Sequence, residues 1–244
     1  MTDLLISDLH LSPQRPATTR AFFDFLQHRA QAADSLYILG DLVEAWLGDD
    51  DPDPLSRELV RQLRALSDSG TRLYFLHGNR DFLIGTGFAR ETGAVLLGDY
   101  QVMEGPAGRI LLCHGDTLCS DDLEYQKFRR RVRNPAIRWL LAHLPLRHRQ
   151  RLARKWRTQS SAANSNKPAN IMDVNDATVA QVMADYRCDT LIHGHTHRPG
   201  EHSYSWGKRI VLGDWHQRGW YVEINDHAIQ LHAFVIDDGE AISG

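Results

Sequence analysis

Seven side chains that can bind metal ions follow short apolar runs at five separate places in the chain. They are Asp8, His10, Asp41, Asn79, His114, His195 and His197. At each place a run of apolar residues is followed by a cluster of Asp, His, Asn and Gly. Open α/β sheets gather their sites at the carboxyl ends of their strands. The repeated pattern therefore predicts that parallel strands bring the seven side chains together at one edge of a sheet.

Two of these places carry a pair of ligands spaced two residues apart, Asp8 with His10 and His195 with His197. In an extended strand, side chains two residues apart point to the same face. We therefore expect an extended backbone at both pairs, with the two members of each pair directed to the same site.

The number and chemistry of the ligands indicate a pair of metal ions. Two divalent cations roughly 3.5–4 Å apart can hold the attacking and leaving oxygens of an in-line displacement. Seven ligands, one of them shared by both ions, make two sets of four. The mixture of carboxylate, amide and imidazole donors favours manganese or iron, with zinc and cobalt as alternatives. A thiolate zinc site is excluded because the three cysteines form no cluster in the sequence. The predicted chemistry is hydrolysis of a phosphoester or a phosphoanhydride.

Length and composition are those of a soluble globular protein with a single domain. The chain has 244 residues, of which 42% are hydrophobic and 24% are charged. No apolar run approaches the roughly 20 residues that a membrane-spanning helix needs. Cleavage of a signal peptide would remove Asp8 and His10, so we expect the protein to work in the compartment where it is made.

The pattern along the chain predicts alternating strands and helices. We predict strands at Leu4–Ser7, Ser35–Leu39, Arg72–Leu76, Arg109–Cys113 and Thr190–Ile192, and helices at Thr19–Gln31, Pro54–Ser69 and Asp173–Tyr186. From Arg209 onward, three short β runs separated by turn residues predict meandering strands. Such an order favours two packed sheets with helices outside them.

The net charge of −3 conceals a strong asymmetry. Residues 125–172 contain 13 Lys or Arg and no Asp or Glu, whereas the rest of the chain contains 15 basic and 31 acidic residues, a balance of −16. Pro135 and Pro145 divide the basic block into short helical pieces. We interpret the block as a helical insertion, or cap, at about residues 123–167, on a single domain that spans residues 1–244.

Three interpretations of the basic cap are considered. A run of charge is most often a solvated face, and the alternatives are binding to an anionic membrane or to nucleic acid. Apolar residues recur through the block, among them Trp139, Leu140, Leu152 and Trp156. Their spacing favours acyl chains or a lipid interface, so we expect no nucleic acid partner.

The five places in order, D-x-H, G-D-x-x-E, G-N-x-D, H-G-D and G-H-x-H, resemble the calcineurin-like metallophosphoesterase family over residues 8–197. The resemblance implies an α/β fold of the metallophosphoesterase type, an αββα sandwich of two mixed sheets with a helical cap insertion. It also implies two divalent metal ions, with Mn²⁺ expected first. One ion would bind Asp8, His10, Asp41 and His197. The other would bind Asp41, Asn79, His114 and His195, so that Asp41 bridges the pair.

One departure from the family pattern concerns the leaving group. Many members have G-N-H-D, whose His protonates a leaving alkoxide, whereas this chain has Arg80 at that position. Arginine cannot act as a general acid at neutral pH, but it can pair with a phosphate oxygen. A departing phosphate, whose second pKa is about 6, needs no such acid. Arg80 therefore indicates a pyrophosphate substrate, unless it only pairs with Asp81.

Three features make the resemblance more specific: Arg80, the E-A-W at residues 44–46, and the Trp-containing cap. This closer resemblance extends over essentially the whole chain. The chain is similar to the members of the family that hydrolyse a UDP-linked diacylated glucosamine in lipid A biosynthesis, giving UMP and the acylated sugar 1-phosphate. The implied catalytic residues are Asp41, Asn79 and Arg80. The implied substrate contacts are Asn79, Arg80, Asp122, Ser160, Asn164, Lys167 and His195.

That resemblance also implies a setting for the reaction. The expected partners are a lipid-linked UDP-sugar and an anionic membrane surface, with the chain bound peripherally, as a monomer, to the cytoplasmic face of the bacterial inner membrane. Water held by both metals would attack the uridine-side phosphorus. Glu44, Asp81 and Asp116 are expected to orient ligands rather than to bind metal, and Trp46 is either a packed aromatic or a lipid contact.

Two other functions stay open at this level. The first is a metallophosphoesterase that acts on another nucleotide, a phosphoprotein or a DNA end. The second is a metallophosphoesterase fold that serves as a binding scaffold, although such scaffolds typically lose ligands and all seven are present here.

Overall fold

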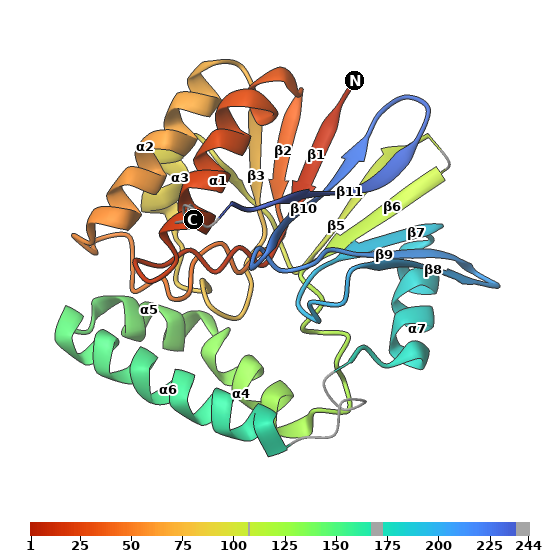
Figure 1. The fold of residues 1–244 in the computed structure, drawn as a ribbon. Helices are drawn as coiled ribbons and strands as arrows, with labels where there is room; N and C mark the ends of the chain where they lie inside the picture. Colours follow the sequence, from red (N-terminus) through yellow and green to blue (C-terminus); the bar gives the residue numbers. More distant parts are fainter. Residues whose placement is uncertain (107, 167–172, 238–244) are drawn as a thin grey trace, which may run out of the picture.

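Two β-sheets pack face to face and carry helices on both outer sides, as Figure 1 shows for the computed structural model. The structure describes residues 1–106, 108–166 and 173–237, without the side chains of residues 159–166. The predicted αββα sandwich of two mixed sheets is confirmed.

The first sheet has six strands in the order β11-β10-β1-β2-β3-β4. Its members are β1 (Asp3–Ile6), β2 (Ser35–Ile38), β3 (Arg72–Phe75), β4 (Val95–Leu96), β10 (Arg218–Ile224) and β11 (Ile229–Val235). The second sheet has five strands in the order β5-β6-β7-β9-β8. Its members are β5 (Tyr100–Gly105), β6 (Gly108–Cys113), β7 (Thr190–His193), β8 (Gly200–Tyr204) and β9 (Gly207–Val211).

Each sheet has a parallel centre and an antiparallel margin. Strands β1 to β4 are parallel, as are β6, β7 and β9, whereas β10 and β11 pair antiparallel beside β1. Every residue of β1 and of β7 is buried. Central parallel strands are covered on both faces, which explains why they read as continuous apolar runs.

Three apolar layers hold the sandwich together. One lies between the sheets and includes Leu5, Leu39, Leu112 and Ile192. A second packs the first sheet against α1 (Pro16–His28), α2 (Pro54–Asp68) and α3 (Thr86–Thr92). The third packs the second sheet against α7 (Asp176–Tyr186). These layers fix both sheets, and with them the strand ends that carry the predicted ligands.

The predicted boundaries of two helices were wrong, for local reasons. The first helix begins at Pro16 rather than Thr19 and ends at His28, after which a short 3₁₀ helix, η1 (Ala30–Ala32), follows. Proline suits the first helical position because its missing N–H would be unpaired there. The last predicted helix begins at Asp176, because the side chain of Asn175 caps it by accepting from Thr178 N at 3.0 Å.

The predicted meander after Arg209 was also wrong, because its three strands divide between the two sheets. β9 lies beside β7 in the second sheet, whereas β10 and β11 form an antiparallel pair in the first. The segment between β9 and β10 bonds to both sheets, since Leu212 N donates to His193 O at 2.8 Å and Trp215 N donates to Asp8 O at 3.1 Å. The crossing therefore passes the sheet edge where the ligands lie.

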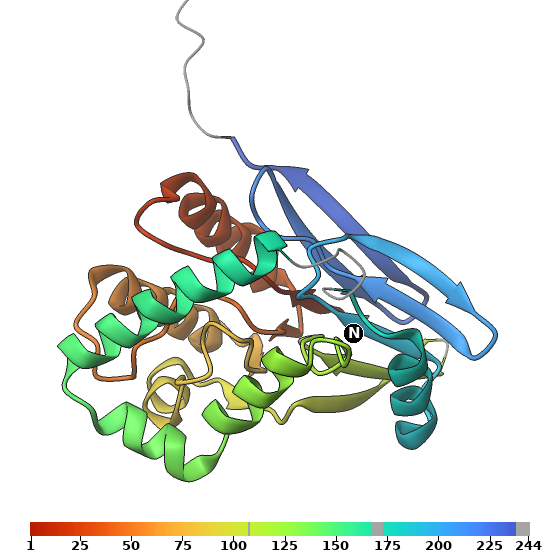
Figure 2. The same cartoon turned by 90° about the horizontal axis from the view of Figure 1, so that it is seen from below.

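Three helices of the basic block lie below that edge in Figure 1 and are seen from beneath in Figure 2. They are α4 (Leu123–Val132), α5 (Pro135–His143) and α6 (Leu146–Asn166), and we call them the cap. Their inner side chains join Phe82 and Leu83 of the main body in one apolar cluster. None of the helices in the described residues combines the length and the apolar character needed to cross a membrane.

A few arginines attach the cap to the body. Arg133 donates to His77 O and Gly78 O at 3.1 and 2.8 Å. Arg149, on α6, is almost completely buried and donates to Leu47 O at 2.6 Å and to both oxygens of Asp50 at 2.6 and 2.5 Å. These contacts tie the cap to the loops that follow β2 and β3.

Candidate metal centre and the adjoining cavity

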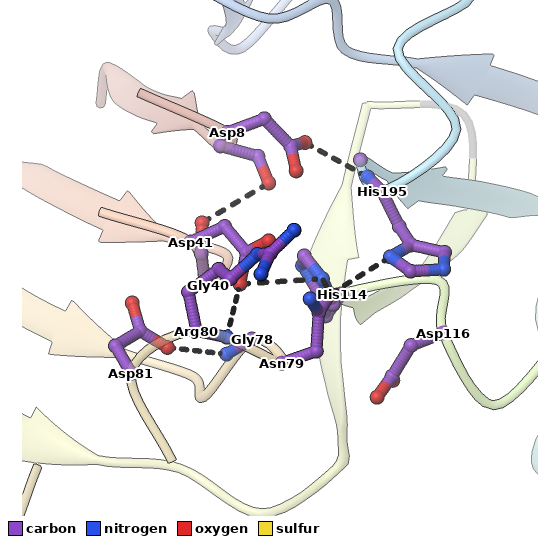
Figure 3. Close-up of polar contacts among 12 residues, drawn as sticks. Asp8, Gly40, Asp41, Gly78, Asn79, Arg80, Asp81, His114, Asp116 and His195 are labelled. Carbon is purple, nitrogen blue, oxygen red and sulfur yellow. Dashed lines mark hydrogen bonds and ion pairs between the residues drawn. The ribbon is translucent and has the colours of Figure 1, made fainter. Parts of the chain in front are cut away.

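The seven predicted ligands lie just beyond the carboxyl ends of five parallel strands, three from the first sheet and two from the second. Asp8 and His10 follow β1, Asp41 follows β2 and Asn79 follows β3; His114 follows β6, and His195 and His197 follow β7. Figure 3 shows several of these side chains gathered around Asp41. The sandwich thus brings them together from both sheets at one edge.

The predicted extended backbone at the paired ligands was wrong. Asp8, His10, Asp41, His195 and His197 have φ values of 57°, 49°, 53°, 69° and 55°, which lie in the left-handed region. Residues other than glycine adopt this conformation at a cost of order 1–3 kcal/mol each. The chain has already left the strands at these positions, and the left-handed turns aim the side chains inward.

Neighbouring loops hold this unusual backbone in place. Asp8 N donates to Gly40 O at 3.1 Å, and His10 N donates to Asp41 O at 3.0 Å. Gly40 has a φ of 88°, and a Cβ there would lie 2.3 Å from the backbone nitrogen of Gly78. Only glycine allows the loops after β2 and β3 to approach this closely.

One cluster of ligands is formed by Asp8, His10 and His197. The Nε2 atoms of His10 and His197 are 3.3 Å apart, and Asp8 Oδ1 lies 3.4 Å from His197 Nε2. Asp8 is completely buried, and its Oδ1 has no hydrogen-bond partner among the described residues. A buried carboxylate oxygen without a partner is costly unless a cation satisfies it, so this cluster fits a metal ion.

A second cluster is formed by Asn79, His114 and His195. Asn79 Oδ1 lies 3.1 Å from both His114 Nε2 and His195 Nδ1. His114 Nδ1 lies 2.8 Å from Leu39 O. If Nδ1 carries the proton and donates it to this carbonyl, Nε2 keeps its lone pair for a metal ion.

Asp41 lies between the two clusters. Its Oδ2 is 3.7 Å from His10 Nε2, and its Oδ1 is 3.8 Å from His114 Nε2. Oδ1 also accepts from Arg80 N at 2.8 Å. One oxygen therefore faces each cluster, which is the arrangement that a bridging carboxylate needs.

The charges of the ligands are strongly interdependent. Burial by itself would raise the pKa of Asp8, but the ion pair with His197 and the nearby imidazoles of His114 and His10 lower it below its ordinary value. Burial would lower the pKa of His197, but Asp8 outweighs this effect and raises it to about 9. For His195, burial and the neighbouring His114 lower the pKa to about 4. Asp8 is thus held ionised, as a carboxylate that binds metal must be.

Carboxylates around the clusters support the ligands. Asp81 accepts from Leu42 N at 2.8 Å and from Gly78 N at 2.7 Å, which joins the loops after β2 and β3. Burial and the charge of Asp41 raise its pKa to about 6. Both Asp81 oxygens are engaged by backbone amides, and Arg80 Nε has no hydrogen-bond partner among the described residues. The alternative in which Arg80 merely pairs with Asp81 has no support in these contacts.

Asp116 connects the centre to the cap. It is buried and accepts from Tyr125 Oη and Arg129 Nε, both on α4, at 2.7 Å. The ring of Tyr125 in turn stacks against that of His195, with centroids 6.0 Å apart. The first cap helix is thereby held against the second cluster.

Asp214 is a neighbour of the centre that the sequence reading missed. Its Oδ2 lies 3.7 Å from His197 Nδ1. Asp214 follows β9 in the sequence I-V-L-G-D, and an apolar run ending in G-D is also the form of the stretch that carries Asp41. That repeat could have identified it.

A cavity of about 460 Å³ opens beside the centre, between the body and the cap. Its polar lining includes Glu44, Asn79, Arg80 and Asp122. Its apolar lining includes Trp46, Leu47, Phe82, Leu83, Phe128, Leu141, Leu152 and Trp156. Asn79 belongs to both the second cluster and the cavity lining, so an occupant of the cavity would reach the metal ligands.

The predicted substrate contacts are only partly described. Asn79, Arg80 and Asp122 line the cavity, and His195 belongs to the second cluster. Ser160 and Asn164 lie on α6, but their side chains are outside the described part of the chain, as is Lys167 entirely. These seven contacts stay predictions.

Trp46 proves to be a core residue that also lines the cavity. Its side chain is 5% exposed, packs edge-on against Phe88 with ring centroids 5.4 Å apart, and donates from Nε1 to Asp49 Oδ1 at 3.0 Å.

Comparison with known proteins identifies the family. The sequence model described as calcineurin-like phosphoesterase matches residues 1–199. The chain belongs to this family. It is therefore a metal-dependent hydrolase, and the oxygen and imidazole donors of both clusters suit the divalent metal ions that this implies.

Relatives resemble the chain over almost its full length. A protein of Pseudomonas fluorescens (strain SBW25) named UDP-2,3-diacylglucosamine hydrolase is 51% identical over 95% of this chain and 94% of its own length. A protein of the same name from Enterobacter sp. (strain 638) is 50% identical over 96% of this chain and 99% of its own. Among solved structures, an archaeal phosphodiesterase with 10% identity covers 96% of this chain and 100% of its own, with a TM-score of 0.52, a likeness of fold alone.

Proposed function

We propose that this chain hydrolyses the pyrophosphate bond of UDP-2,3-diacylglucosamine, giving UMP and 2,3-diacylglucosamine 1-phosphate (lipid X), a step of lipid A biosynthesis. Relatives that are about half identical over nearly their whole length carry this activity in their names. The observation that carries the proposal is the junction of a candidate metal centre with an apolar cavity, with Arg80 at the boundary. A lipid-linked pyrophosphate has the same division into a charged part and an apolar part.

We further propose that two ions, Mn²⁺ in the first instance, bind at the two clusters. Bound divalent cations would lower the pKa of water and neutralise charge on phosphate oxygens. Asp8, His10, Asp41 and His197 would hold one ion, and Asp41, Asn79, His114 and His195 the other. The unpartnered oxygen of Asp8 and the two-sided position of Asp41 support this assignment.

Arg80 is proposed to bind the phosphate oxygens. Its backbone is held on both sides, since its N–H donates to Asp41 Oδ1 at 2.8 Å and its carbonyl accepts from Trp46 N at 3.2 Å. Its side chain lines the cavity next to Asn79. A guanidinium remains charged throughout the reaction and can bind two phosphate oxygens at once. Arg80 would stabilise the charge on the departing sugar phosphate without transferring a proton.

The apolar part of the cavity is proposed to hold the acyl chains. Phe128, Leu152 and Trp156 of the cap line it together with Phe82 and Leu83 of the body. Burial of each methylene contributes about 0.8 kcal/mol. Such a surface would distinguish an acylated UDP-sugar from a soluble nucleotide sugar that carries the same pyrophosphate.

We also propose that the chain binds peripherally, as a monomer, to the cytoplasmic face of the inner membrane. The side chains of Trp139 and Leu140 on α5 are 63% and 51% exposed. Exposed cations accompany them on the cap, at Lys127, Arg130, Arg131, Arg147, Arg151, Arg154 and Lys155. Apolar residues that enter the interface, combined with cations that attract anionic lipids, are the two requirements for reversible attachment.

The decisive experiment is turnover of UDP-2,3-diacylglucosamine dispersed in detergent, with and without Mn²⁺, followed by identification of the products. We expect UMP and the diacylated sugar 1-phosphate, and no turnover after chelation. If that substrate is inert while a small phosphodiester is cleaved rapidly, the substrate assignment is wrong.

Isotope labelling tests which phosphorus is attacked. In ¹⁸O-labelled water, the label should appear in UMP, because water attacks the uridine-side phosphorus and the sugar phosphate departs. Label in the sugar phosphate would contradict this direction of attack.

A further inference from the structure

Glu44 lies between the cap and a predicted metal ligand. Its Oε2 is 3.5 Å from His10 Nδ1, and its Oε1 is 3.4 Å from Arg157 Nε on α6. The Glu44 side chain is 24% exposed and that of Arg157 is 48% exposed. One carboxylate thus faces a ligand in the body with one oxygen and a cation of the cap with the other.

The imidazole nitrogen of His10 that faces away from the first cluster, Nδ1, lies beside Glu44. His10 Nε2 faces Asp41 and His197 in the first cluster. Its Nδ1 is buried and makes no hydrogen bond within the described residues, and Glu44 Oε2 is the carboxylate oxygen placed beside it. An imidazole that binds metal through one nitrogen is held in tautomer and orientation by an acceptor at the other. Glu44 is in position to provide that acceptor once the distance shortens.

The outer contacts of two other histidine ligands come from the body instead. His114 Nδ1 lies 2.8 Å from Leu39 O, at the end of β2. His197 Nδ1 lies 3.7 Å from Asp214, which follows β9. Leu39 and Asp214 belong to the sandwich, and among the described residues the ion pairs give Asp214 no partner on the cap. The Glu44 contact is different because it also extends to α6.

We propose that Glu44 is a positioning residue that couples the pairing of Arg157, on α6, to the orientation of His10. When Arg157 and Glu44 are paired, the Glu44 carboxylate is held against His10 Nδ1, and the first cluster binds its cation more tightly. Because coupling between two binding equilibria is reciprocal, cation binding would in turn favour the cap position that closes the cavity. The inference rests on the proposed function, in that it assigns a cation to the first cluster.

Arg149 offers a matched control for this coupling. It is on the same helix, eight positions before Arg157, and lines the same cavity. Its partners are Asp50 and the carbonyl of Leu47, neither of which is a predicted ligand. Arg149→Gln therefore removes a different contact between α6 and the body and keeps the pair of Arg157 and Glu44.

The test is titration of the metal-free protein with Mn²⁺ by calorimetry, without substrate, so that its result does not depend on which substrate is used. Glu44→Ala should weaken one of the two binding steps by about 10–100-fold, the range for loss of an outer partner of a ligand. Glu44→Gln should weaken it less, because the amide oxygen can still accept from His10 Nδ1. Arg157→Gln should weaken the same step by up to about fivefold, the size of an exposed ion pair, and Arg157→Lys should restore it.

Two further variants separate coupling from general loosening of the cap. Arg149→Gln should leave both Mn²⁺ affinities unchanged. In the Glu44→Gln background, Arg157→Gln should have no additional effect, because the charged partner has already been removed. Thermal denaturation of each metal-free variant shows whether it is folded, and Glu44→Gln keeps the test informative if Glu44→Ala does not fold.

Three outcomes would overturn the inference and leave the proposed function intact. Unchanged Mn²⁺ binding in Glu44→Ala would remove the positioning role, and unchanged binding in Arg157→Gln would remove the coupling to the cap. An equal loss in Arg149→Gln and Arg157→Gln would assign the effect to cap loosening instead. Wild-type protein that binds no divalent cation would overturn the proposed function itself, and the inference with it.

Discussion

The metal edge of the sandwich and the cap are built by different means. At the edge, backbone hydrogen bonds between adjacent loops hold the ligands, and Asp8 and Asp41 are almost completely buried. The cap is attached largely through long side chains such as Arg133 and Arg149, and it leaves Trp139 on its surface. The first region is fixed by main-chain geometry and the second by side-chain contacts.

The sheet edge and the cap therefore suit different tasks. Chemistry at phosphorus needs ligands placed to a fraction of an ångström, which loops joined by backbone hydrogen bonds provide. Recognition of an acyl chain needs apolar area rather than exact directions, because the hydrophobic effect is not directional. Single substitutions should therefore be severe at the edge and graded in the cap.

Asp41→Ala should have the largest effect. The substitution removes the one carboxylate that faces both clusters, so we expect metal content to fall and turnover to drop by more than the roughly 10–100-fold typical of outer partners. The circular dichroism spectrum should be retained. As a matched control, Asp214→Asn removes only an outer carboxylate and should cost less. Substantial turnover in Asp41→Ala would contradict a bridging role.

Arg80→Ala should be the next most severe change. Loss of a charge that stabilises the phosphate oxygens should lower kcat by about 10²–10³-fold, with bound metal unchanged when measured by elemental analysis. Arg80→Lys should recover part of the rate, because it keeps the charge but not the two-point contact. An unchanged kcat in Arg80→Ala would leave Arg80 with a structural role only.

Phe128→Ala tests the apolar wall of the cavity. Removal of this ring should lower kcat/KM for a long-chain UDP-diacylglucosamine by about tenfold, as part of its burial energy is lost. Hydrolysis of a small phosphodiester should be unaffected. Arg154→Ala, on the exposed side of α6, is the control. Equal losses on both substrates would mean that the wall supports the centre rather than the chains.

The exposed face of the cap should give the smallest effect. Trp139→Ser combined with Leu140→Ser should reduce binding to vesicles that contain phosphatidylglycerol by about fivefold, since little apolar area enters the interface. Activity on substrate dispersed in detergent should not change. Vesicle binding that is insensitive to these substitutions would remove the apolar residues from the docking surface and leave the cations alone.

Much of the sandwich could be read from local patterns. Five central strands were predicted to within about two residues, because buried parallel strands are short apolar runs bounded by turn residues. The start of α1 depended instead on Pro16, and the start of α7 depended on which residue caps the helix, which is Asn175 rather than a residue before Asp173 because it contacts Thr178. The division of β9 and β10 between two sheets could not be read locally, because either sheet accepts an apolar strand.

At the centre, the residue types and their order along the chain were sufficient to predict a metal-dependent phosphoesterase. Ligand chemistry resides in individual side chains, and each lies beside an apolar run that marks a strand. Folding alone set the left-handed backbone at Asp8 and His195, the place of Asp41 between two clusters, and the contact of Glu44 with Arg157 across 113 positions. These features arise where separate loops meet, so they depend on how the two sheets and the cap pack and not on any local stretch of sequence.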